Sequence, residues 1–293
     1  MPELPEVETL AAHLRKTNLL GQRIKRIEVR FPKLLDGCTV KQFQNKLIDQ
    51  EIIAISRRGK FLVFAFSGQL FLLVHLRMSG HFFLKKEGTE KDQHEHLIFS
   101  LENHNSLRYR DTRKFGRFYL VSNPELILGK LGPEPLDSDQ FTPHYLLQAL
   151  HKKRTLLKRF LLDQGSIAGL GNIYVDESLW QAKLHPLLYT IELNLKDAIR
   201  LHQSIQEVLK KGIAWGGTSL GRGTVNFHHL DGNVGSHQNQ LMVYGRADLP
   251  CLRCGAKIQK IKVVQRSTHF CPNCQQRYTE NDSRKCYKVP GRY

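Results

Sequence analysis

Four cysteines near the end of the chain constrain its fold more than any other feature. Cys251 and Cys254 form one C-x-x-C pair, and sixteen residues later Cys271 and Cys274 form a second. Each pair presents two sulfurs to one ion, and this spacing is typical of a four-thiolate zinc site. The alternating residues between the pairs predict a β-hairpin, followed by a turn signal at Arg266-Ser267-Thr268. We therefore expect one structural Zn²⁺ ion that fastens a hairpin.

Two disulfides are the alternative for these four cysteines. We recognise no signal peptide at the start of the chain, and we therefore expect a reducing compartment, which disfavours disulfides. Cys38 and Cys286 are left over. We expect Cys38 to be an unremarkable, partly buried thiol and Cys286 to lie in a basic tail.

The positive charge of the chain is spread over both of its halves. The net charge is +17 in 293 residues; residues 251–293 hold ten Lys/Arg against two Asp/Glu, and residues 1–133 hold 22 against 14. A basic excess in both halves indicates a long polyanion as the partner. An anionic membrane is the alternative, but no apolar run approaches spanning length and neither end resembles a basic amphipathic anchor. We therefore expect nucleic acid, and no membrane, as the partner.

The hydrophobic pattern of the first half of the chain predicts one helix followed by strands. A helix over residues 5–15 is expected first, because its start combines proline, acidic residues and helical spacing. From residue 23 to residue 121, short apolar runs are separated by turn signals, which predicts a β-sandwich. The expected strands cover residues 52–55, 61–66, 70–76, 80–84, 96–101, 107–110 and 117–121.

A Pro/Gly-rich stretch at residues 131–138 indicates a domain boundary, after which the pattern becomes helical. The glycine-rich residues 165–172 are expected to turn between two helices, and such a turn can aim N–H groups at a phosphate, with Asn172 as side-chain donor. An ordinary helical hairpin is the alternative. The expected helices cover residues 145–150, 156–162, 173–182 and 193–211.

Several polar segments are not needed to build the core of a sandwich or a helical hairpin. In their chain order they resemble the formamidopyrimidine-DNA glycosylase family of bacterial base-excision repair enzymes. They are residues 2–9, 57–60, 75–80, 111–116, 131–136, 169–174 and 244–246, together with the zinc hairpin.

The resemblance implies an α+β multidomain fold. The expected domains are an N-terminal catalytic β-sandwich flanked by helices over residues 1–133 and a helix–two-turn–helix DNA-binding domain over 134–245. A zinc finger over 246–278 and a basic, disordered tail over 279–293 follow. Residues 216–240, rich in glycine and asparagine, are expected to form a loop that caps the damaged base. His228, His229 and His237 in this loop are expected to bind no metal.

The resemblance also implies the chemistry. Pro2, once Met1 is removed, would be the nucleophile, because a terminal secondary amine has a lower pKa than a lysine side chain and is therefore more often uncharged near neutral pH. Glu3 would be the acid/base carboxylate, with Glu6 beside it, and Lys60 and Arg266 complete the catalytic set. The expected reaction removes oxidised purines from duplex DNA and cuts the strand at the resulting abasic site by β- and δ-elimination.

Other side chains are implied to hold the DNA. The damaged base must leave the stack, and apolar side chains that enter the gap are a known device for this. Met78, Arg113 and Phe115 are the expected gap-filling residues, whereas the expected phosphate contacts are His75, Lys158, Asn172 and Tyr244.

Two other functions stay open at this point: an endonuclease VIII-like enzyme for oxidised pyrimidines, and a non-catalytic zinc-containing DNA-binding protein. One departure from the family pattern is Arg77, where glycine is expected. We expect a monomer that acts in the bacterial cytoplasm, associated with the nucleoid.

Overall fold

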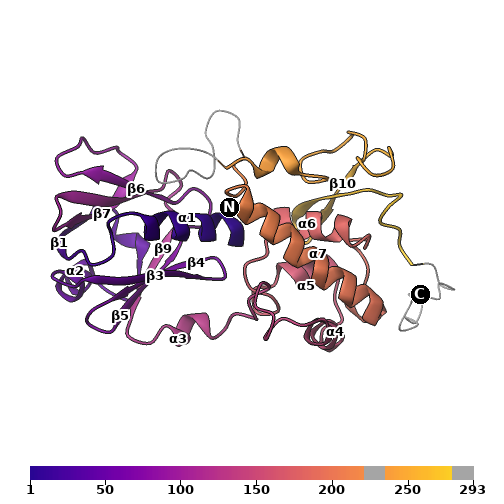
Figure 1. Cartoon of the computed structure of the whole chain (residues 1–293), viewed down its shortest axis with the longest axis horizontal. Helices are drawn as coiled ribbons and strands as arrows, with labels where there is room; N and C mark the ends of the chain where they lie inside the picture. The colour runs from indigo at the N-terminus through magenta and orange to yellow at the C-terminus, as the bar shows by residue number, and fades with distance from the viewer. Residues whose placement is uncertain (221–234, 279–293) are drawn as a thin grey trace. The chain divides into compact units, whose positions relative to one another are not determined.

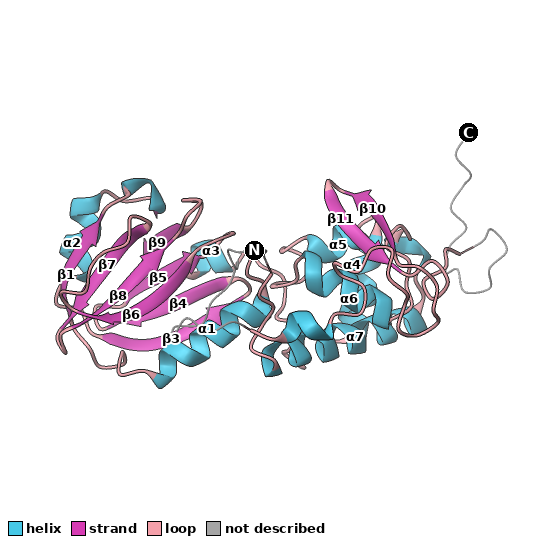
Figure 2. Ribbon diagram, turned by 90° about the horizontal axis from the view of Figure 1, so that it is seen from above, coloured by secondary structure: helices cyan, strands magenta, loops and turns pink. Residues whose placement is uncertain are grey.

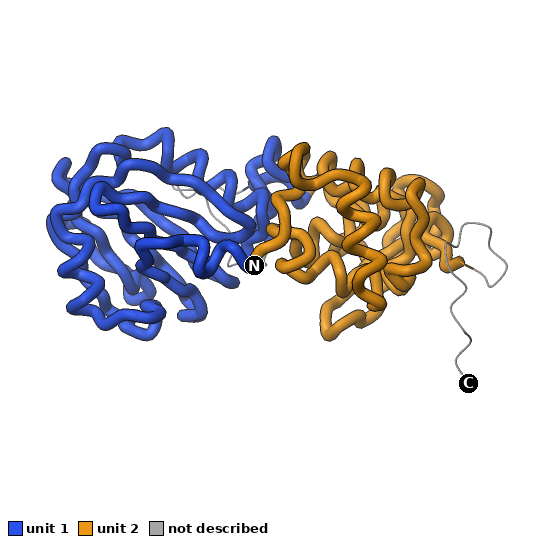
Figure 3. The backbone as a smooth tube through the Cα atoms, turned by 90° about the horizontal axis from the view of Figure 1, so that it is seen from below, with its two compact units in different colours: residues 1–130, 212–238 blue, residues 131–211, 239–293 orange. Residues whose placement is uncertain are grey.

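The computed structural model describes residues 1–220 and 235–278, and the chain forms two compact units (Figure 3). The N-terminal unit comprises Met1–Lys130 and Gly212–Gln238, and the C-terminal unit comprises Leu131–Lys211 and Asn239–Tyr293. After the first part of the C-terminal unit, the chain comes back to the N-terminal unit at Gly212–Gln238. From the sequence alone, these residues are expected in the helical domain instead. Residues 221–234 and the tail 279–293, with His228, His229 and Cys286, lie outside the described residues.

The N-terminal unit is built on two sheets that pack face to face (Figure 2). The first sheet has the order β1-β7-β8-β6 and the second the order β2-β9-β5-β4-β3; only the β2–β9 pair is parallel. The rings of Phe64 and Phe82, one from each sheet, lie 5.9 Å apart in the shared core. The strands are β1 (Ile24–Val29), β2 (Leu35–Asp36), β3 (Ile52–Arg58), β4 (Phe61–Phe66), β5 (Leu70–His75), β6 (His81–Lys86), β7 (Glu95–Leu101), β8 (Asn105–Arg110) and β9 (Arg117–Val121).

Helix α1 (Leu4–Lys16) packs along β3 at the edge of the second sheet (Figure 1). Its buried stripe of leucine and valine faces the core, as the helical spacing predicted. Two arginines fix its direction: Arg15 Nη1 donates to the carbonyl of Ile55 at 3.2 Å, and Arg57 Nε donates to Glu8 Oε2 at 2.9 Å. The helix therefore runs antiparallel to β3, with its N-terminal end toward the end of that strand.

A second helix interrupts the region that the sequence pattern assigned to strands. Helix α2 (Val40–Leu47) begins after Thr39, whose hydroxyl accepts from the backbone N–H of Gln42 at 3.2 Å, while Gln42 Oε1 accepts from the Thr39 N–H at 2.9 Å. This reciprocal pair is a capping box, which is a readable helix-start signal. The expectation of an all-β pattern from residue 23 to residue 121 was wrong here.

The C-terminal unit is helical up to the zinc finger. Helix α4 (Pro143–Lys152) begins at a conventional cap: Thr142 Oγ1 accepts from the N–H of Tyr145 at 3.1 Å, and Pro143 occupies the first turn. No helix in the described part of the chain has the length and apolar character needed to cross a membrane. The helices of the remaining chain are α3 (Glu125–Leu128), α4 (Pro143–Lys152), α5 (Leu157–Leu162), α6 (Asn172–Gln181) and α7 (Leu195–Ala214), with 3-10 turns at Pro32–Leu34, Thr190–Glu192 and His237–Gln240.

Strands β10 (Gln259–Val263) and β11 (Arg266–Phe270) form the hairpin between the two cysteine pairs. Val264 and Gln265 make the turn, and both have positive φ angles, of 48° and 57°. The turn signal placed at residues 266–268 was therefore wrong: Arg266 is the first residue of β11 and pairs with Val263. Two consecutive left-handed residues are what a type I′ hairpin turn requires, although asparagine and glycine are its usual residues.

Candidate active site and zinc centre

One end of the second sheet gathers most of the candidate residues of the N-terminal unit. The start of β4, the end of β5 and the start of β9 lie side by side, because Phe61 pairs with His75 and His75 pairs with Arg117. Each neighbouring connection therefore emerges at this same end. The connections carry Lys60 in the two-residue β3–β4 turn, Met78 after β5, and Arg113 and Phe115 before β9.

The N-terminal end of α1 is directed toward this end of the sheet. Arg57 links the two elements, because its Nε donates to Glu8 on α1 and its Nη1 donates to the carbonyl of Gly59, 3.1 Å away, in the turn that carries Lys60. Pro2 is buried, and Glu3 and Lys60 are only 3% and 5% exposed. The structure thus brings these three candidate catalytic groups to one end of one unit, largely shielded from water.

Glu6 ties the start of α1 to the returning segment of the same unit. Its Oε2 accepts from the N–H of Glu3 at 2.8 Å, and its Oε1 accepts from the N–H of Thr218 at 2.7 Å. Gly217, at φ 80°, lies so close that a Cβ there would be 3.0 Å from Glu6 Cγ. The sequence placed Glu6 beside Glu3 without a role; only its long-range partner reveals that it anchors the base of the 216–240 loop.

The other described end of that loop is held by hydrogen bonds to hydroxyl groups. Gly235 N–H donates to Ser219 Oγ at 2.9 Å, and the side chains of Thr218 and His237 meet at 3.0 Å. His237 is buried and bonded to a hydroxyl. The described residues of the loop contain no metal cluster that includes it.

His75 is neutral at physiological pH. Burial lowers its pKa to about 3, and the positive charges of Arg77 and Lys60 act in the same direction. Its Nδ1 accepts from the N–H of Arg77 at 3.1 Å, so the ring proton resides on Nε2. His75 can therefore offer a neutral N–H, not a positive charge, to a phosphate.

This buried imidazole makes the stability of the fold depend on pH. The unfolded His75 titrates near pH 6.5 and the folded one near pH 3, so the unfolded chain binds more protons between these values, and stability falls as the pH drops below about 6.5. We expect His75→Gln to reduce the stability loss between pH 7 and pH 5 by about 2 kcal/mol. Urea unfolding at both pH values measures this difference.

His104→Asn is the matched control, because the side chain of His104 is 91% exposed and its left-handed backbone suits asparagine. We expect this control to lose as much stability on acidification as the unmodified protein. An equal loss in His75→Gln would show that His75 is not buried in its neutral form.

The gap-filling candidates are presented on exposed turns. Phe115 is 48% exposed, which is unusual for a large aromatic side chain, and the guanidinium of Arg113 lies 4.8 Å from its ring centroid. Arg77, which stands where glycine is expected, has a φ angle of 58°. That angle explains why glycine suits the position and shows that arginine is accommodated there with some backbone strain.

In the C-terminal unit, Arg266 sits beside a carbonyl held by two candidate residues. Asn172 Nδ2 and Lys158 Nζ both donate to the carbonyl of Ser267, at 2.8 and 3.1 Å. The Lys158 side chain is 0% exposed and also donates to Asp176 at 2.6 Å. Lys158, expected at a phosphate, thus lies beneath the hairpin that carries the exposed Arg266.

Two acidic residues that the sequence did not single out hold this region together. Asp176 accepts from Lys158 and from the N–H of His269 at 2.9 Å. Glu177 accepts from three successive backbone N–H groups, including that of Tyr244 at 2.8 Å, and the Tyr244 ring lies edge-on to His269, 5.1 Å between centroids. The sequence did carry a signal for them: Asp176 and Glu177 lie in α6, a helix with hardly any polar face, so both carboxylates need buried partners.

The four cysteines of the zinc motif converge in the structure. Their sulfurs all lie within 4.8 Å of one another, and tetrahedral Zn–S bonds of about 2.3 Å place sulfurs about 3.8 Å apart. The Cys254–Cys271 separation of 3.4 Å is too long for a disulfide, and all four thiols are unpaired. The donor set fits a structural zinc ion, as predicted.

Neighbouring groups complete the zinc centre. Trp180 Nε1 and the N–H of Cys274 point at sulfurs of Cys251 and Cys271, both at 3.4 Å, as expected around thiolate ligands. The Arg253 guanidinium stacks 3.8 Å from the Trp180 ring. The zinc finger is therefore packed on the end of α6.

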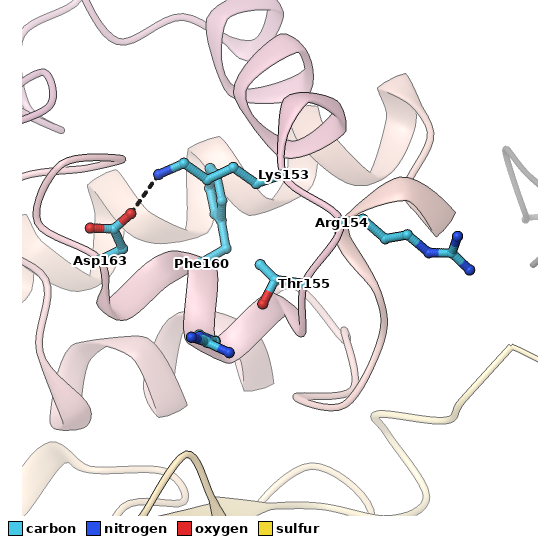
Figure 4. Close-up of a pocket in the computed structure, with 6 residues that line it drawn as sticks. Lys153, Arg154, Thr155, Phe160 and Asp163 are labelled. Carbon is cyan, nitrogen blue, oxygen red and sulfur yellow. Dashed lines mark hydrogen bonds and ion pairs between the residues drawn. The ribbon is translucent and has the colours of Figure 1, made fainter.

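A hollow of about 480 Å³ lies elsewhere in the C-terminal unit and contains none of the candidate residues (Figure 4). Lys153 bridges part of it by an ion pair with Asp163 at 2.6 Å, whereas Arg154 points away from that pair (Figure 4). The lining consists of Lys153, Arg154, Thr155, Arg159, Phe160 and Asp163. Mostly exposed cations and an acid make this a solvated surface.

Comparisons with known proteins agree with this organisation. Three family models match: the formamidopyrimidine-DNA glycosylase N-terminal domain over residues 1–118, the formamidopyrimidine-DNA glycosylase H2TH domain over 131–223, and the zinc finger found in FPG and IleRS over 248–277. The chain is 48% identical over 277 residues to a formamidopyrimidine-DNA glycosylase of Protochlamydia amoebophila, covering 94% of this chain and 100% of that protein. The corresponding enzyme of Lactiplantibacillus plantarum is 42% identical, with coverage of 93% and 98%.

Solved structures give the same result. Lactococcus lactis Fpg in complex with DNA containing an abasic site has a TM-score of 0.86 at 41% identity, covering 94% of this chain and 100% of that one. A point mutant of the same enzyme, bound to DNA containing Fapy-dG, has the same TM-score, identity and coverage.

Proposed function

Because the chain belongs to the formamidopyrimidine-DNA glycosylase family, we propose that it removes oxidised purines from duplex DNA and cuts the strand at the resulting abasic site. Named relatives at 39–48% identity and solved complexes with Fapy-dG and abasic-site DNA support this substrate class. The zinc ion has a structural role. The same proposal places the enzyme on chromosomal DNA of the bacterial nucleoid, acting as a monomer.

The observation that carries the proposal is the convergence of Pro2, Glu3 and Lys60 at one end of the second sheet, next to turns that expose Phe115. Removal of Met1 gives Pro2 a free secondary amine, which attacks C1′ of the damaged nucleotide while the bond to the base breaks. The resulting iminium acidifies the adjacent C–H, so that β- and δ-elimination follow. Glu3, buried beside Pro2, moves protons in these steps.

The remaining candidates bind the DNA. Met78, Arg113 and Phe115 fill the gap left by the everted base. Arg266 and Asn172, which lie beside the Ser267 carbonyl, bind phosphates on either side of the damaged nucleotide. The secondary candidates for phosphate contacts are His75, Lys158 and Tyr244. The positive charge of both halves of the chain raises the affinity for any duplex and makes it salt-dependent.

Borohydride trapping tests this function on the unmodified protein. We expect a covalent protein–DNA adduct with a duplex that contains 8-oxoguanine, because borohydride reduces the imine between Pro2 and the sugar. A duplex with an oxidised pyrimidine is the comparison substrate and should give much less adduct. Preferential trapping on the pyrimidine lesion would reassign the specificity, and binding without any adduct would indicate a non-catalytic protein.

A further inference from the structure

The two exposed turns of the N-terminal unit share one buried carboxylate. We call residues 76–80 and 111–116 the wedge turns, since they carry the gap-filling candidates. Asp111 is 0% exposed. Its Oδ1 accepts from the hydroxyl of Ser79 at 2.5 Å and from the N–H of Arg113 at 3.1 Å, and its Oδ2 accepts from the N–H of Gly116 at 2.8 Å. A single side chain is thus bonded to both turns at once.

A buried phenol completes the connection. Tyr109 on β8 donates to Asp111 Oδ2 at 3.2 Å, and burial raises its pKa well above the ordinary value, so that the hydroxyl keeps its proton. A Cβ at Gly80, in the first turn, would lie 2.1 Å from the Tyr109 oxygen, and one at Gly116, in the second, 1.9 Å. Both turns therefore pack on the same phenol, and neither position has room for a side chain.

The Ser79 hydroxyl extends this set of contacts. It donates to Asp111 and also accepts from the N–H of Arg113 at 3.1 Å. Arg113 therefore has its backbone fixed by both turns, while its guanidinium stacks on Phe115. Met78 is the residue next to Ser79, so the three gap-filling side chains extend from a backbone that these contacts hold in one arrangement.

We infer that Asp111 is a positioning residue: its carboxylate fastens the two wedge turns into one rigid unit, so that Met78, Arg113 and Phe115 enter the DNA stack together. This inference rests on the proposed function. Side chains that must fill a gap as a group act best when their geometry is set before binding, because the cost of ordering them is then met during folding. Asp111 itself is buried beneath the turns and acts through them.

Ser79→Ala and Asp111→Asn test the inference. Both are small changes, and Ser79→Ala removes the hydrogen bonds that join the turns while leaving the other Asp111 contacts in place. We expect excision of 8-oxoguanine from duplex DNA to fall by about 10- to 100-fold, as for other small displacements of positioned groups. Cleavage of a duplex with a preformed abasic site should change by less than about 3-fold, because no base remains to be displaced.

A second measurement separates positioning from general destabilisation. Met78→Ala should reduce the excision rate by a much smaller factor in the Ser79→Ala background than in the unmodified protein. The reason is that each change alone already prevents the three side chains from entering the DNA stack together. Glu95→Gln is the matched control. Glu95 is also 0% exposed, and its carboxylate binds Lys85 on β6 and Arg108 on β8, at 2.7 and 3.0 Å. This control should lower the melting temperature and leave the ratio of excision to abasic-site cleavage unchanged.

The outcomes distinguish the inference from the function on which it depends. If the unmodified protein excises no 8-oxoguanine, the proposed function fails. If it does, but Ser79→Ala and Asp111→Asn reduce both reactions equally, or Met78→Ala costs as much with Ser79→Ala as without it, the positioning role of Asp111 is overturned.

Discussion

A protein that keeps one residue in front of Pro2 is expected to bind damaged DNA and to form no borohydride-trapped adduct. The preceding residue converts the secondary amine of Pro2 into an amide, whose nitrogen has no basic lone pair to attack C1′. We expect strand cleavage to fall by at least about 10³-fold, in the range typical for loss of a nucleophile. Trapping and single-turnover cleavage, with N-terminal mass spectrometry of the same sample, measure this effect.

The structure shows why such a protein should fold. The described chain already has Met1 in front of the buried Pro2, and α1 begins at Leu4 in its presence. Met1 is 38% exposed, so a residue at this position has room. Pro2→Gly, fully processed, is the control, because its primary amine can still form an imine; it should retain intermediate activity. If the blocked protein cuts lesion-bearing DNA at nearly the normal rate, Pro2 is not the nucleophile, and Lys60 becomes the leading candidate amine.

The sequence predicted those features that depend on local pattern. The short apolar runs at residues 61–66 and 70–76 identify β4 and β5 almost to the residue, and the helical spacing of Val7, Leu10 and Leu14 identifies α1. The zinc centre was readable because ligand type and spacing alone define it. These signals are short-range, so they survive without knowledge of the tertiary fold.

Long-range partners were not readable. Nothing near Asp111 in the chain indicates that its carboxylate lies between Ser79 and Gly116, since this depends on which strands are neighbours in the first sheet and the second. The order β2-β9-β5-β4-β3 could not be predicted for the same reason, because a strand pattern does not say which strands pair. Lys158 illustrates the consequence: in the sequence it is one cation of a basic cluster, and in the structure it is enclosed with Asp176.

The burial of Lys158 predicts a large loss of stability when its charge is removed. Lys158→Met keeps most of the side-chain volume but leaves the Asp176 carboxylate, 0% exposed, without its cation. Removing one partner of a buried ion pair costs about 3–5 kcal/mol. Urea unfolding of the zinc-loaded protein, followed by tryptophan fluorescence, measures this loss. A Trp215→Phe background leaves Trp180 as the single tryptophan, and Trp180 packs against Cys251 in the same unit as Lys158.

Lys153→Met is the matched control, because Lys153 also pairs with an aspartate at 2.6 Å but the two side chains are 49% and 44% exposed (Figure 4). A surface pair contributes about 0–1 kcal/mol, so we expect Lys153→Met to lose much less stability than Lys158→Met. Lys158 also holds the Ser267 carbonyl beside Arg266, so Lys158→Met should weaken DNA binding only as far as the hairpin loosens. If instead Lys158→Met is as stable as Lys153→Met and yet binds DNA far more weakly, Lys158 contacts phosphate directly and the buried pair opens when DNA binds.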